Sequence, residues 1–378
     1  MPVLDPADAA ELERYDQFVR SHPHRALTQD VRWGIVKDDW GQEAVYVEEG
    51  GRIVSAMTVL VRRLPGGFSV LYAPRGPLVD WDDEHAVASI LAEAAPLATK
   101  HRAIMTRMDP EIRFDDALDS WMRTQPGWVV KNVGAGKDDL IQPRYNMVVA
   151  LKDAEGNQLT EEELLRKYNS TTRSRVRAGL RKGVEMSLGS SEEDLRIFYD
   201  VYSQMARRKE ITARDATYFE RMREAFGDRM HIAVARHEGD VLAVAILIDY
   251  YGKLSYLYAG SSDVKRNLYG SNVLNHALMA FGLDHGAESY DLGGVFALDS
   301  SDGLYVFKRA FAKADGATEL IGEIDIVHRK LAYAALATAL PRMQHGRRMV
   351  AARLSQAKKR RAAAKKAARA HAIPPVGG

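Results

Sequence analysis

Two stretches of this sequence share one pattern: VYVEEGGRIVSAMTVLV at residues 45–61 and HIAVARHEGDVLAVAILI at residues 231–248. Each contains an apolar segment, a glycine-containing turn and a second, longer apolar segment, which is the pattern of a β-hairpin. Residues 69–72 and 254–258 add a third short apolar strand to each copy. The sequence therefore predicts two antiparallel meanders, one in each half of the chain.

Each predicted meander is followed by a helix and a further buried strand. We expect helices over Glu84–His101 and Gly270–His285, and strands over Ala103–Met108 and Ser289–Leu292. Three strands, a helix and a fourth strand form an α+β layer. This order resembles the fold of the acetyl-CoA-dependent N-acetyltransferases, so the sequence predicts two tandem acetyltransferase-like (GNAT-like) domains of the α+β class.

The domain boundaries follow from the repeat and from the distribution of charge. We expect the first domain over residues 1–150, the second over residues 151–318, and a basic helical tail over residues 329–378. Of the 53 Lys and Arg residues, 13 lie in the tail, which contains none of the 51 acidic residues. Such a tail is attracted to polyanions, either nucleic acid or an anionic membrane surface.

Several classes of protein are excluded or disfavoured by what the 378 residues lack. The chain has no cysteine, which excludes disulfide scaffolds, thiol catalysis and iron–sulfur clusters. It has no phosphate-binding loop of the form Gly-x-x-x-x-Gly-Lys-Ser/Thr and no His-Glu-x-x-His. The acidic run from Asp109 to Asp116 has no histidine beside it, so we predict no metal site. No apolar run is long enough to span a membrane and no signal segment is evident, so we expect a cytoplasmic protein.

The segment Leu159–Gly183, between the two copies, is predicted to be helical. Thr160 and Glu163 form a capping box, and Gly183 is a suitable C-terminal stop. Cationic side chains are dense in its second half, and they suit the phosphates of a nucleic acid: Arg173, Arg175, Arg177, Arg181 and Lys182.

An acetyl-CoA enzyme of this fold needs a glycine-rich turn whose free N–H groups hold the pyrophosphate at a helix N-terminus. The corresponding residues 265–272, KRNLYGSN, have only Gly270. Residues 80–85 in the first copy, DWDDEH, are acidic. The scaffold therefore suits an acyl donor other than coenzyme A.

Six segments, in this order, resemble the Fem (FemABX) family of non-ribosomal peptidyltransferases: residues 26–40, 72–80, 107–110, 170–184, 256–262 and 302–311. Enzymes of that family move an amino acid from aminoacyl-tRNA to the stem peptide of a peptidoglycan precursor, UDP-MurNAc-pentapeptide or lipid II, to form an interpeptide bridge. The resemblance implies two GNAT-like domains, aminoacyl-tRNA as co-substrate and no cofactor. It also implies that residues 319–327 return to domain 1 as a final strand. We expect no long helical arm between Gly183 and Gly294.

The resemblance also implies catalytic residues. Lys308, after Phe307 in a predicted loop, would stabilise the oxyanion or the departing 3′-oxygen of the tRNA; the alternative is a surface lysine beside a core phenylalanine. Asp109, at the end of a strand, would face the cleft and accept the proton of the acceptor amine or hold its ammonium. With Pro110 behind it, a purely structural turn is equally consistent with the sequence.

The substrate-binding residues are implied in the same way. Lys37 and Arg214 would pair with phosphates of the nucleotide or lipid carrier, although each is also consistent with a solvated cation. Tyr218, Tyr256 and Tyr258 would line the substrate cleft. Because alternate residues of a strand share a face, the last two are expected on one side of their strand, either in the cleft or in the core. Glu323 is a further, weaker candidate.

Three other functions compete with this interpretation. The same tRNA-dependent transfer could modify a small peptide metabolite, the chain could be a non-catalytic RNA-binding protein, or it could be an acyl-CoA N-acyltransferase. The missing pyrophosphate turn disfavours the last, and the Phe307-Lys308 pair disfavours the second. The basic tail fits either tRNA or peripheral contact with the inner membrane surface.

Overall fold

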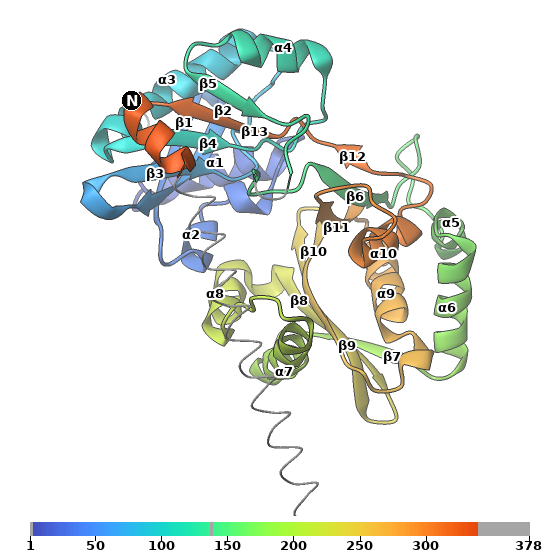
Figure 1. The fold of residues 1–378 in the computed structure, drawn as a ribbon. Helices are drawn as coiled ribbons and strands as arrows, with labels where there is room; N and C mark the ends of the chain where they lie inside the picture. Colours follow the sequence, from blue (N-terminus) through green and yellow to red (C-terminus); the bar gives the residue numbers. More distant parts are fainter. Residues whose placement is uncertain (1–2, 137–138, 339–378) are drawn as a thin grey trace, which may run out of the picture. The chain divides into compact units, whose positions relative to one another are not determined.

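Two mixed β-sheets organise Met1–His328 in the computed structural model, which describes residues 3–136 and 139–338 (Figure 1). Contacts divide the chain into two units, Met1–His328 and Arg329–Gly378. The two sheets and the helices that cover them all belong to the first unit. We call the part built on the first sheet lobe 1 and the part built on the second sheet lobe 2.

The sheet of lobe 1 has six strands in the order β1 (Gly41–Glu49), β2 (Arg52–Arg63), β3 (Ser69–Ala73), β4 (Ala103–Met108), β13 (Glu323–Val327) and β5 (Trp128–Lys131). β1, β2 and β3 form the predicted antiparallel meander. The helix α3 (Glu84–Lys100) then carries the chain to β4, which pairs in parallel with β3. Asp83 caps α3 by accepting hydrogen bonds from two N–H groups, so a carboxylate occupies the place where an acetyltransferase would hold a phosphate.

The sheet of lobe 2 has seven strands in the order β12 (Thr318–Glu319), β6 (Tyr145–Ala150), β11 (Ser289–Val295), β10 (Lys253–Ser261), β9 (Asp240–Tyr250), β8 (Met230–His237) and β7 (Glu185–Gly189). The meander β8–β9–β10 leads through α9 (Gly270–Asp284) to β11, which is parallel to β10. The same connections occur in lobe 1, so the predicted duplication is confirmed.

Two strands cross between the lobes. β13 lies between β4 and β5 in lobe 1, while β6 lies beside β11 in lobe 2. We expected the first domain to end at residue 150, but β6 belongs to the sheet of lobe 2, so we propose a division before Tyr145. The segment 319–327 is likewise not one strand, because Glu319 ends β12 in lobe 2 and Glu323 begins β13 in lobe 1.

Gly322 lies at this crossing with a φ of 101°. Residues with a Cβ rarely adopt that backbone conformation. A Cβ built there would also overlap the Lys131 carbonyl oxygen. Glycine thus lets the chain leave one sheet and enter the other within three residues.

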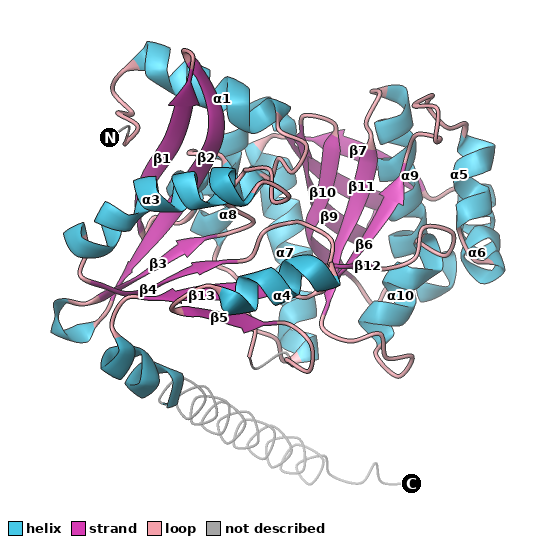
Figure 2. Ribbon diagram, turned by 90° about the horizontal axis from the view of Figure 1, so that it is seen from above, coloured by secondary structure: helices cyan, strands magenta, loops and turns pink. Residues whose placement is uncertain are grey.

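Helices cover both faces of each sheet (Figure 2). In lobe 1, α1 (Ala9–Ser21) and α3 pack on opposite faces, and α4 (Asp116–Thr124) lies beside β5. In lobe 2, α7 (Glu192–Lys209) and α8 (Ala216–Phe226) cover one face, while α9 packs on the other. The buried side chains of α1 and β2 join those of α7, α8 and β9 in one continuous cluster. This cluster places one face of each lobe toward the other.

The predicted helix over Leu159–Gly183 is two helices, α5 (Glu161–Lys167) and α6 (Ser170–Arg181). The capping box of Thr160 and Glu163 is confirmed. The break arises at Asn169, whose side chain accepts a hydrogen bond from the N–H of Thr172 and so starts a second helix. Between Gly183 and Gly294 the described residues form strands and the helices α7, α8 and α9, without a long helical arm.

None of the helices in the described part of the chain is long and apolar enough to cross a membrane. Residues 330–338 of the basic tail are helical. The rest of the predicted helical tail, residues 339–378, lies outside the described residues.

Candidate active site

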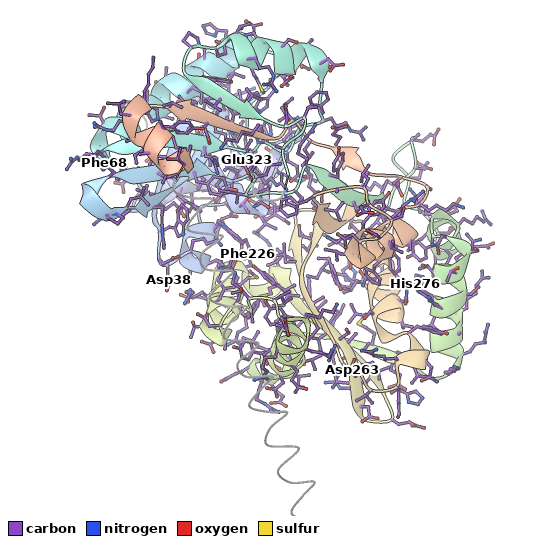
Figure 3. All side chains as sticks on the ribbon, in the orientation of Figure 1. Asp38, Phe68, Phe226, Asp263, His276 and Glu323 are labelled. Carbon is purple, nitrogen blue, oxygen red and sulfur yellow. The ribbon has the colours of Figure 1, made fainter. Side chains whose placement is uncertain are left out.

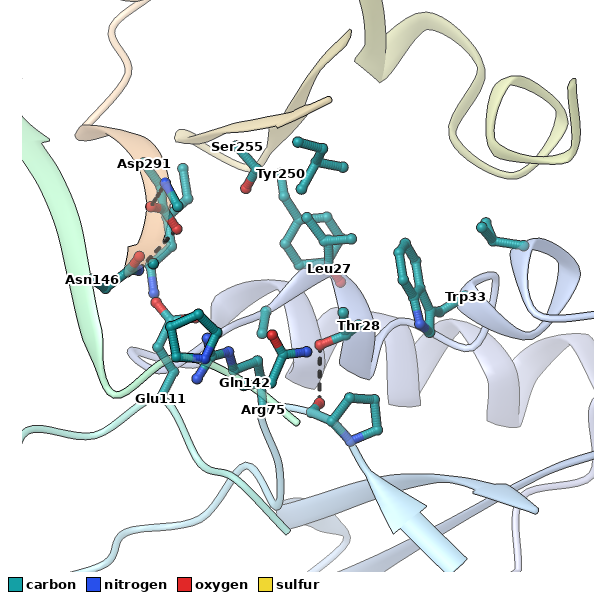
Figure 4. Close-up of a pocket in the computed structure, with 18 of the residues that line it drawn as sticks. Leu27, Thr28, Trp33, Arg75, Glu111, Gln142, Asn146, Tyr250, Ser255 and Asp291 are labelled. Carbon is teal, nitrogen blue, oxygen red and sulfur yellow. Dashed lines mark hydrogen bonds between the residues drawn. The ribbon is translucent and has the colours of Figure 1, made fainter. Parts of the chain in front are cut away.

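A cavity of about 1520 Å³ lies between the lobes and is lined by residues of both. Trp33, Arg75 and Glu111 come from lobe 1, and Tyr250, Ser255 and Asp291 come from lobe 2 (Figure 4). Its wall also contains four of the predicted site residues: Lys37, Arg214, Tyr218 and Tyr258. The structure thus brings together residues from distant parts of the sequence.

At one end of the cavity two cations lie against aromatic rings. Lys37 follows α2 (Trp33–Val36), and its Nζ lies 5.2 Å from the centre of the Tyr218 ring. The Arg214 guanidinium lies 5.0 Å from the same ring. The Tyr258 hydroxyl donates to the Tyr218 hydroxyl at 3.2 Å. Burial, and secondarily Arg214, lowers the pKa of Lys37 to about 8.

This end is positioned by a contact between α2 and α8. Trp33 packs on Phe226 with ring centres 6.2 Å apart, and Asp38 forms an ion pair with Arg221 at 3.1 Å; Asp38 and Phe226 are labelled in Figure 3. The Arg214 N–H donates to the Tyr202 hydroxyl at 3.2 Å, which fixes the turn before α8. Two cations held against one aromatic ring suit a doubly charged anion such as a diphosphate.

Lys308 lies in a helix, α10 (Gly303–Phe311), and not in the predicted loop. Asp302 caps this helix by accepting a hydrogen bond from the N–H of Leu304. Ala310 lies inside the helix and Ala312 is its C-cap. The Lys308 side chain is only 8% exposed, and its Nζ donates to the Gly294 carbonyl oxygen at 3.0 Å. Gly293 and Gly294 line the cavity, so the ammonium lies directly behind its wall.

The electrostatics of Lys308 are those of a buried cation with acidic neighbours. Burial lowers its pKa to about 8, and Asp291 and Asp302 act in the opposite direction. At neutral pH the side chain therefore remains mostly protonated and can donate to a developing negative charge. Phe307 does not line the cavity; it packs edge-on against Phe311, with ring centres 5.3 Å apart, and supports the helix from the core side.

Asp109 and Glu323 lie behind the cavity and not in its wall. Asp109 is 2% exposed, and its carboxylate accepts hydrogen bonds from the Tyr72 hydroxyl at 2.7 Å and the Arg75 N–H at 2.6 Å. The expectation that its side chain faces the cleft is therefore wrong, because Tyr72 and Arg75 line the cavity and Asp109 lies behind them. Glu323 is 1% exposed inside lobe 1 and forms an ion pair with Arg107 at 3.1 Å (Figure 3).

Tyr256 and Tyr258 do not share a face of β10. The pairing of β10 with β9 shifts by one residue between them, so Leu257 forms a β-bulge. Tyr258 consequently faces the cavity and the cluster between the lobes, while Tyr256 packs on Tyr290 in the core beneath α9. Tyr256 accepts a hydrogen bond from Asn275 and is absent from the cavity wall.

The basic side chains of α6 lie on the outer surface of lobe 2. The helix buries Thr172, Val176 and Gly179, and it exposes Arg175, Arg177, Arg181 and Lys182. Arg173 is half-buried and donates to the Tyr168 carbonyl oxygen at 2.8 Å, so it also has a structural role. The other four form an exposed cationic face.

A sequence model described as the FemAB family matches residues 11–240 and 235–340. This chain belongs to the FemAB family. Among curated FemAB-type relatives, a UDP-N-acetylmuramoylpentapeptide-lysine N(6)-alanyltransferase of Weissella viridescens is 37% identical over 341 residues, covering 89% of this chain and 99% of the relative. A lipid II:glycine glycyltransferase of Staphylococcus aureus is 24% identical and covers 91% of this chain and 98% of the relative.

Solved structures agree with this family at the level of the fold. A crystal structure of FemX superposes with a TM-score of 0.78 at 22% identity and covers 89% of this chain and all of that one. The C-terminal domain of a putative lysylphosphatidylglycerol synthetase from Agrobacterium fabrum has a TM-score of 0.52 at 16% identity, covering 88% and 95% of the two chains. The staphylococcal alignment spans 421 positions, more than the 378 residues of this chain, so that FemAB protein contains residues that this chain lacks.

Three cavity residues were missed by the sequence reasoning: Arg75, Glu111 and Asp291. Arg75 lies in the segment Pro-Arg-Gly-Pro with a φ of 57°, a conformation that residues other than glycine rarely adopt. Glu111 follows Asp109 by two residues, and Asp291 is the last residue of β11 that pairs in parallel with β10. Ligands of α/β sheets often bind beyond the carboxyl ends of parallel strands. These were the available signals, and without the fold they do not separate cavity residues from core residues.

Proposed function

We propose that this chain transfers an amino acid from aminoacyl-tRNA to the stem peptide of a peptidoglycan precursor, UDP-MurNAc-pentapeptide or lipid II. The observation that carries the proposal is that one cavity of a FemAB-family chain is lined by the Lys37–Arg214 cation pair, while the buried Lys308 ammonium lies directly behind its wall at Gly294. The chain is accordingly an aminoacyltransferase.

The cation pair suits the diphosphate that both precursors carry. Its guanidinium and its ammonium both lie against the Tyr218 ring. In this partly dry site, charge-assisted hydrogen bonds to phosphate oxygens are stronger than they would be in water. The cavity extends from this end toward Gly293 and Gly294, so a peptide joined to the diphosphate through its sugar would follow the wall toward Lys308.

The reaction exchanges an ester for an amide and therefore needs no nucleotide hydrolysis. The acceptor amine attacks the ester carbonyl carbon, negative charge develops on the carbonyl oxygen, and the 3′-oxygen of the tRNA departs. A buried ammonium that points at the cavity wall can stabilise either oxygen. The protein supplies the rest of the rate enhancement by holding the acceptor amine and the ester carbonyl close together in the right orientation.

The donor tRNA fits the cationic face of α6. Arg175, Arg177, Arg181 and Lys182 are exposed there, and phosphate contacts of this kind bind without reading sequence. We further propose that the basic tail adds contact with tRNA or with the anionic inner surface of the membrane, at the cytoplasmic side where both substrates are made. Deleting residues 342–378 should weaken binding to tRNA or to anionic vesicles most at low salt, because such contacts are screened.

Transfer of labelled amino acid tests the function. The purified chain is offered tRNA charged with radiolabelled glycine, alanine or serine, together with UDP-MurNAc-pentapeptide or lipid II. UDP-MurNAc without a peptide is the control acceptor. Label should move to one of the two peptide acceptors and not to the control. Stoichiometric binding of an acyl-CoA with no response to charged tRNA would refute the proposal, and label that moves only to a short free peptide would point to a peptide metabolite.

A further inference from the structure

Two charged side chains at one end of the cavity make no side-chain hydrogen bond or ion pair with the residues that the structure describes. They are the carboxylate of Glu111 and the guanidinium of Arg75, which both line the cavity. Figure 4 shows both on the side of the cavity away from Trp33, with Asn146 and Asp291 nearby. Partly buried charges are normally paired, so this end of the cavity is built for a charged ligand.

Asp291 connects this end of the cavity to Lys308. Its carboxylate accepts hydrogen bonds from the Gly293 N–H at 2.6 Å and from the Asn146 side-chain amide at 3.0 Å. These bonds fix the irregularity inside β11 where its pairing with β6 shifts register between Asp291 and Gly294; Gly293 has a φ of 80° there, and the Gly294 carbonyl holds the Lys308 ammonium. Asp291 also favours the charged form of Lys308. A group held between Glu111 and Asp291 is therefore adjacent to Lys308.

Asp109 is unsuited to take a proton from a substrate. Each of its carboxylate oxygens already accepts a hydrogen bond, from the Tyr72 hydroxyl or from the Arg75 N–H, and the residue is 2% exposed. Glu111 follows it by two residues on the same loop and faces the cavity. The carboxylate that a substrate can reach is therefore that of Glu111.

We propose that Glu111 is the catalytic base of the transfer and that Asp291 is the second anchor of the acceptor ammonium. The inference rests on the proposed function. Glu111 takes one proton from the ammonium, and the neutral amine nitrogen forms a bond to the ester carbon. Lys308 gives a proton to the 3′-oxygen as its bond to carbon breaks and takes the second proton from the nitrogen. The products are an amide, a free 3′-hydroxyl and one proton on Glu111, which is released to solvent.

The surroundings of Glu111 favour this role. Burial raises its pKa, and Asp291 and Asp109 act in the same direction, while Lys253 and Arg75 oppose them. A carboxylate with a raised pKa is a stronger base toward an ammonium than one in water. Arg75 favours the ionised form of Glu111, and its guanidinium lines the cavity where it is available to a carboxylate of the stem peptide.

Binding of two acceptors tests the anchoring without requiring turnover. UDP-MurNAc-pentapeptide is compared with the same molecule acetylated on its side-chain amine, by calorimetry, on the wild-type chain, Glu111→Gln and Asp291→Asn. The wild type should bind the free amine about 10-fold more tightly, the value of one charge-assisted hydrogen bond. Both variants should lose that preference. Glu49→Gln, an exposed glutamate outside the cavity, is the matched control.

Turnover separates a base from an anchor. Glu111→Gln should lower kcat about 100-fold, as is typical for loss of a general base, and Glu111→Asp should restore part of it. An acceptor with a less basic side-chain amine should reduce the defect of Glu111→Gln, because that amine loses its proton without help. Asp291→Asn should raise KM more than it lowers kcat.

The outcomes distinguish the two proposals. A wild-type chain that binds no muramyl peptide would refute the proposed function. A wild-type chain that prefers the free amine, with Glu111→Gln showing the same preference and the same kcat, would overturn the inference alone. A defect confined to Asp109→Asn would return the role of base to Asp109.

Discussion

Glu323 should make this protein less stable at pH 8 than at pH 5, and the change Glu323→Gln should remove that dependence. The carboxyl is 1% exposed and accepts hydrogen bonds from the N–H groups of Ile141 and Gln142, beside the Arg107 ion pair. Burial is the main cause that raises its pKa, from the ordinary value of 4.5 to about 7. The folded state therefore holds this proton to a higher pH than the unfolded chain does.

The magnitude follows from that difference. A shift of about 2.5 pKa units at 1.36 kcal/mol per unit corresponds to about 3 kcal/mol, lost progressively as pH rises from about 4.5 to 7 and constant above it. Glutamine keeps the shape and an acceptor oxygen for the two N–H groups, but it does not ionise. Glu323→Gln should accordingly be more stable than the wild type by up to about 3 kcal/mol at pH 8, and close to it at pH 5.

Urea unfolding followed by tryptophan fluorescence at pH 5 and pH 8 measures this difference. Asp325→Asn is the matched control, because Arg107 and Lys131 outweigh burial and hold the pKa of Asp325 below its ordinary value. Its stabilising contribution is present above that value and lost only at lower pH, so Asp325→Asn should destabilise the fold equally at pH 5 and pH 8. An identical stability difference between Glu323→Gln and the wild type at both pH values would refute the reasoning.

Three further predictions concern the cavity and the crossing between the lobes. Lys308→Ala should lower kcat by about 100-fold, the usual effect of losing an oxyanion donor, without weakening binding of the UDP-linked acceptor; undiminished transfer would remove Lys308 from the mechanism. Lys37→Met and Arg214→Met should each weaken binding of UDP-MurNAc-pentapeptide at least about 10-fold in calorimetry. The loss of affinity should shrink when the free stem peptide, which carries no diphosphate, replaces this acceptor. Gly322→Ala should destabilise the fold by about 2 kcal/mol or more in urea, because alanine is strained at a φ of 101° and would meet the Lys131 carbonyl; a fold unchanged in stability would show that the crossing can move.

The sequence was sufficient for features that depend on neighbouring residues. Apolar segments on both sides of the turns at Gly50 and Gly239 predicted both hairpins, which occur as β1–β2 and β8–β9. The capping box at Thr160 was correct for the same reason, since its partners are three residues apart. The break at Asn169 was missed although its cap is equally local, since the residues from Asn169 to Thr172 are of the types that favour helix caps.

Local spacing failed where a single residue changes the register or the depth of a side chain. Tyr256 and Tyr258 follow the rule of alternation in the sequence, but the bulge at Leu257 sends them to opposite faces. Asp109 and Glu111 both follow the end of β4, and only the packing of Tyr72 and Arg75 buries the first and leaves the second in the cavity.

By itself, then, the sequence determined the duplicated α+β scaffold, its family and the absence of the coenzyme A turn, because hydrophobic period, turn residues and caps are written within a few positions of one another. Only the tertiary structure decided which residues form the site. Lys37 and Arg214 line the same cavity because α2 packs on α8. Glu111 and Asp291 line it together because the two lobes share a core. Such pairs depend on how two sheets pack and exchange strands, and no spacing along the chain encodes that distance.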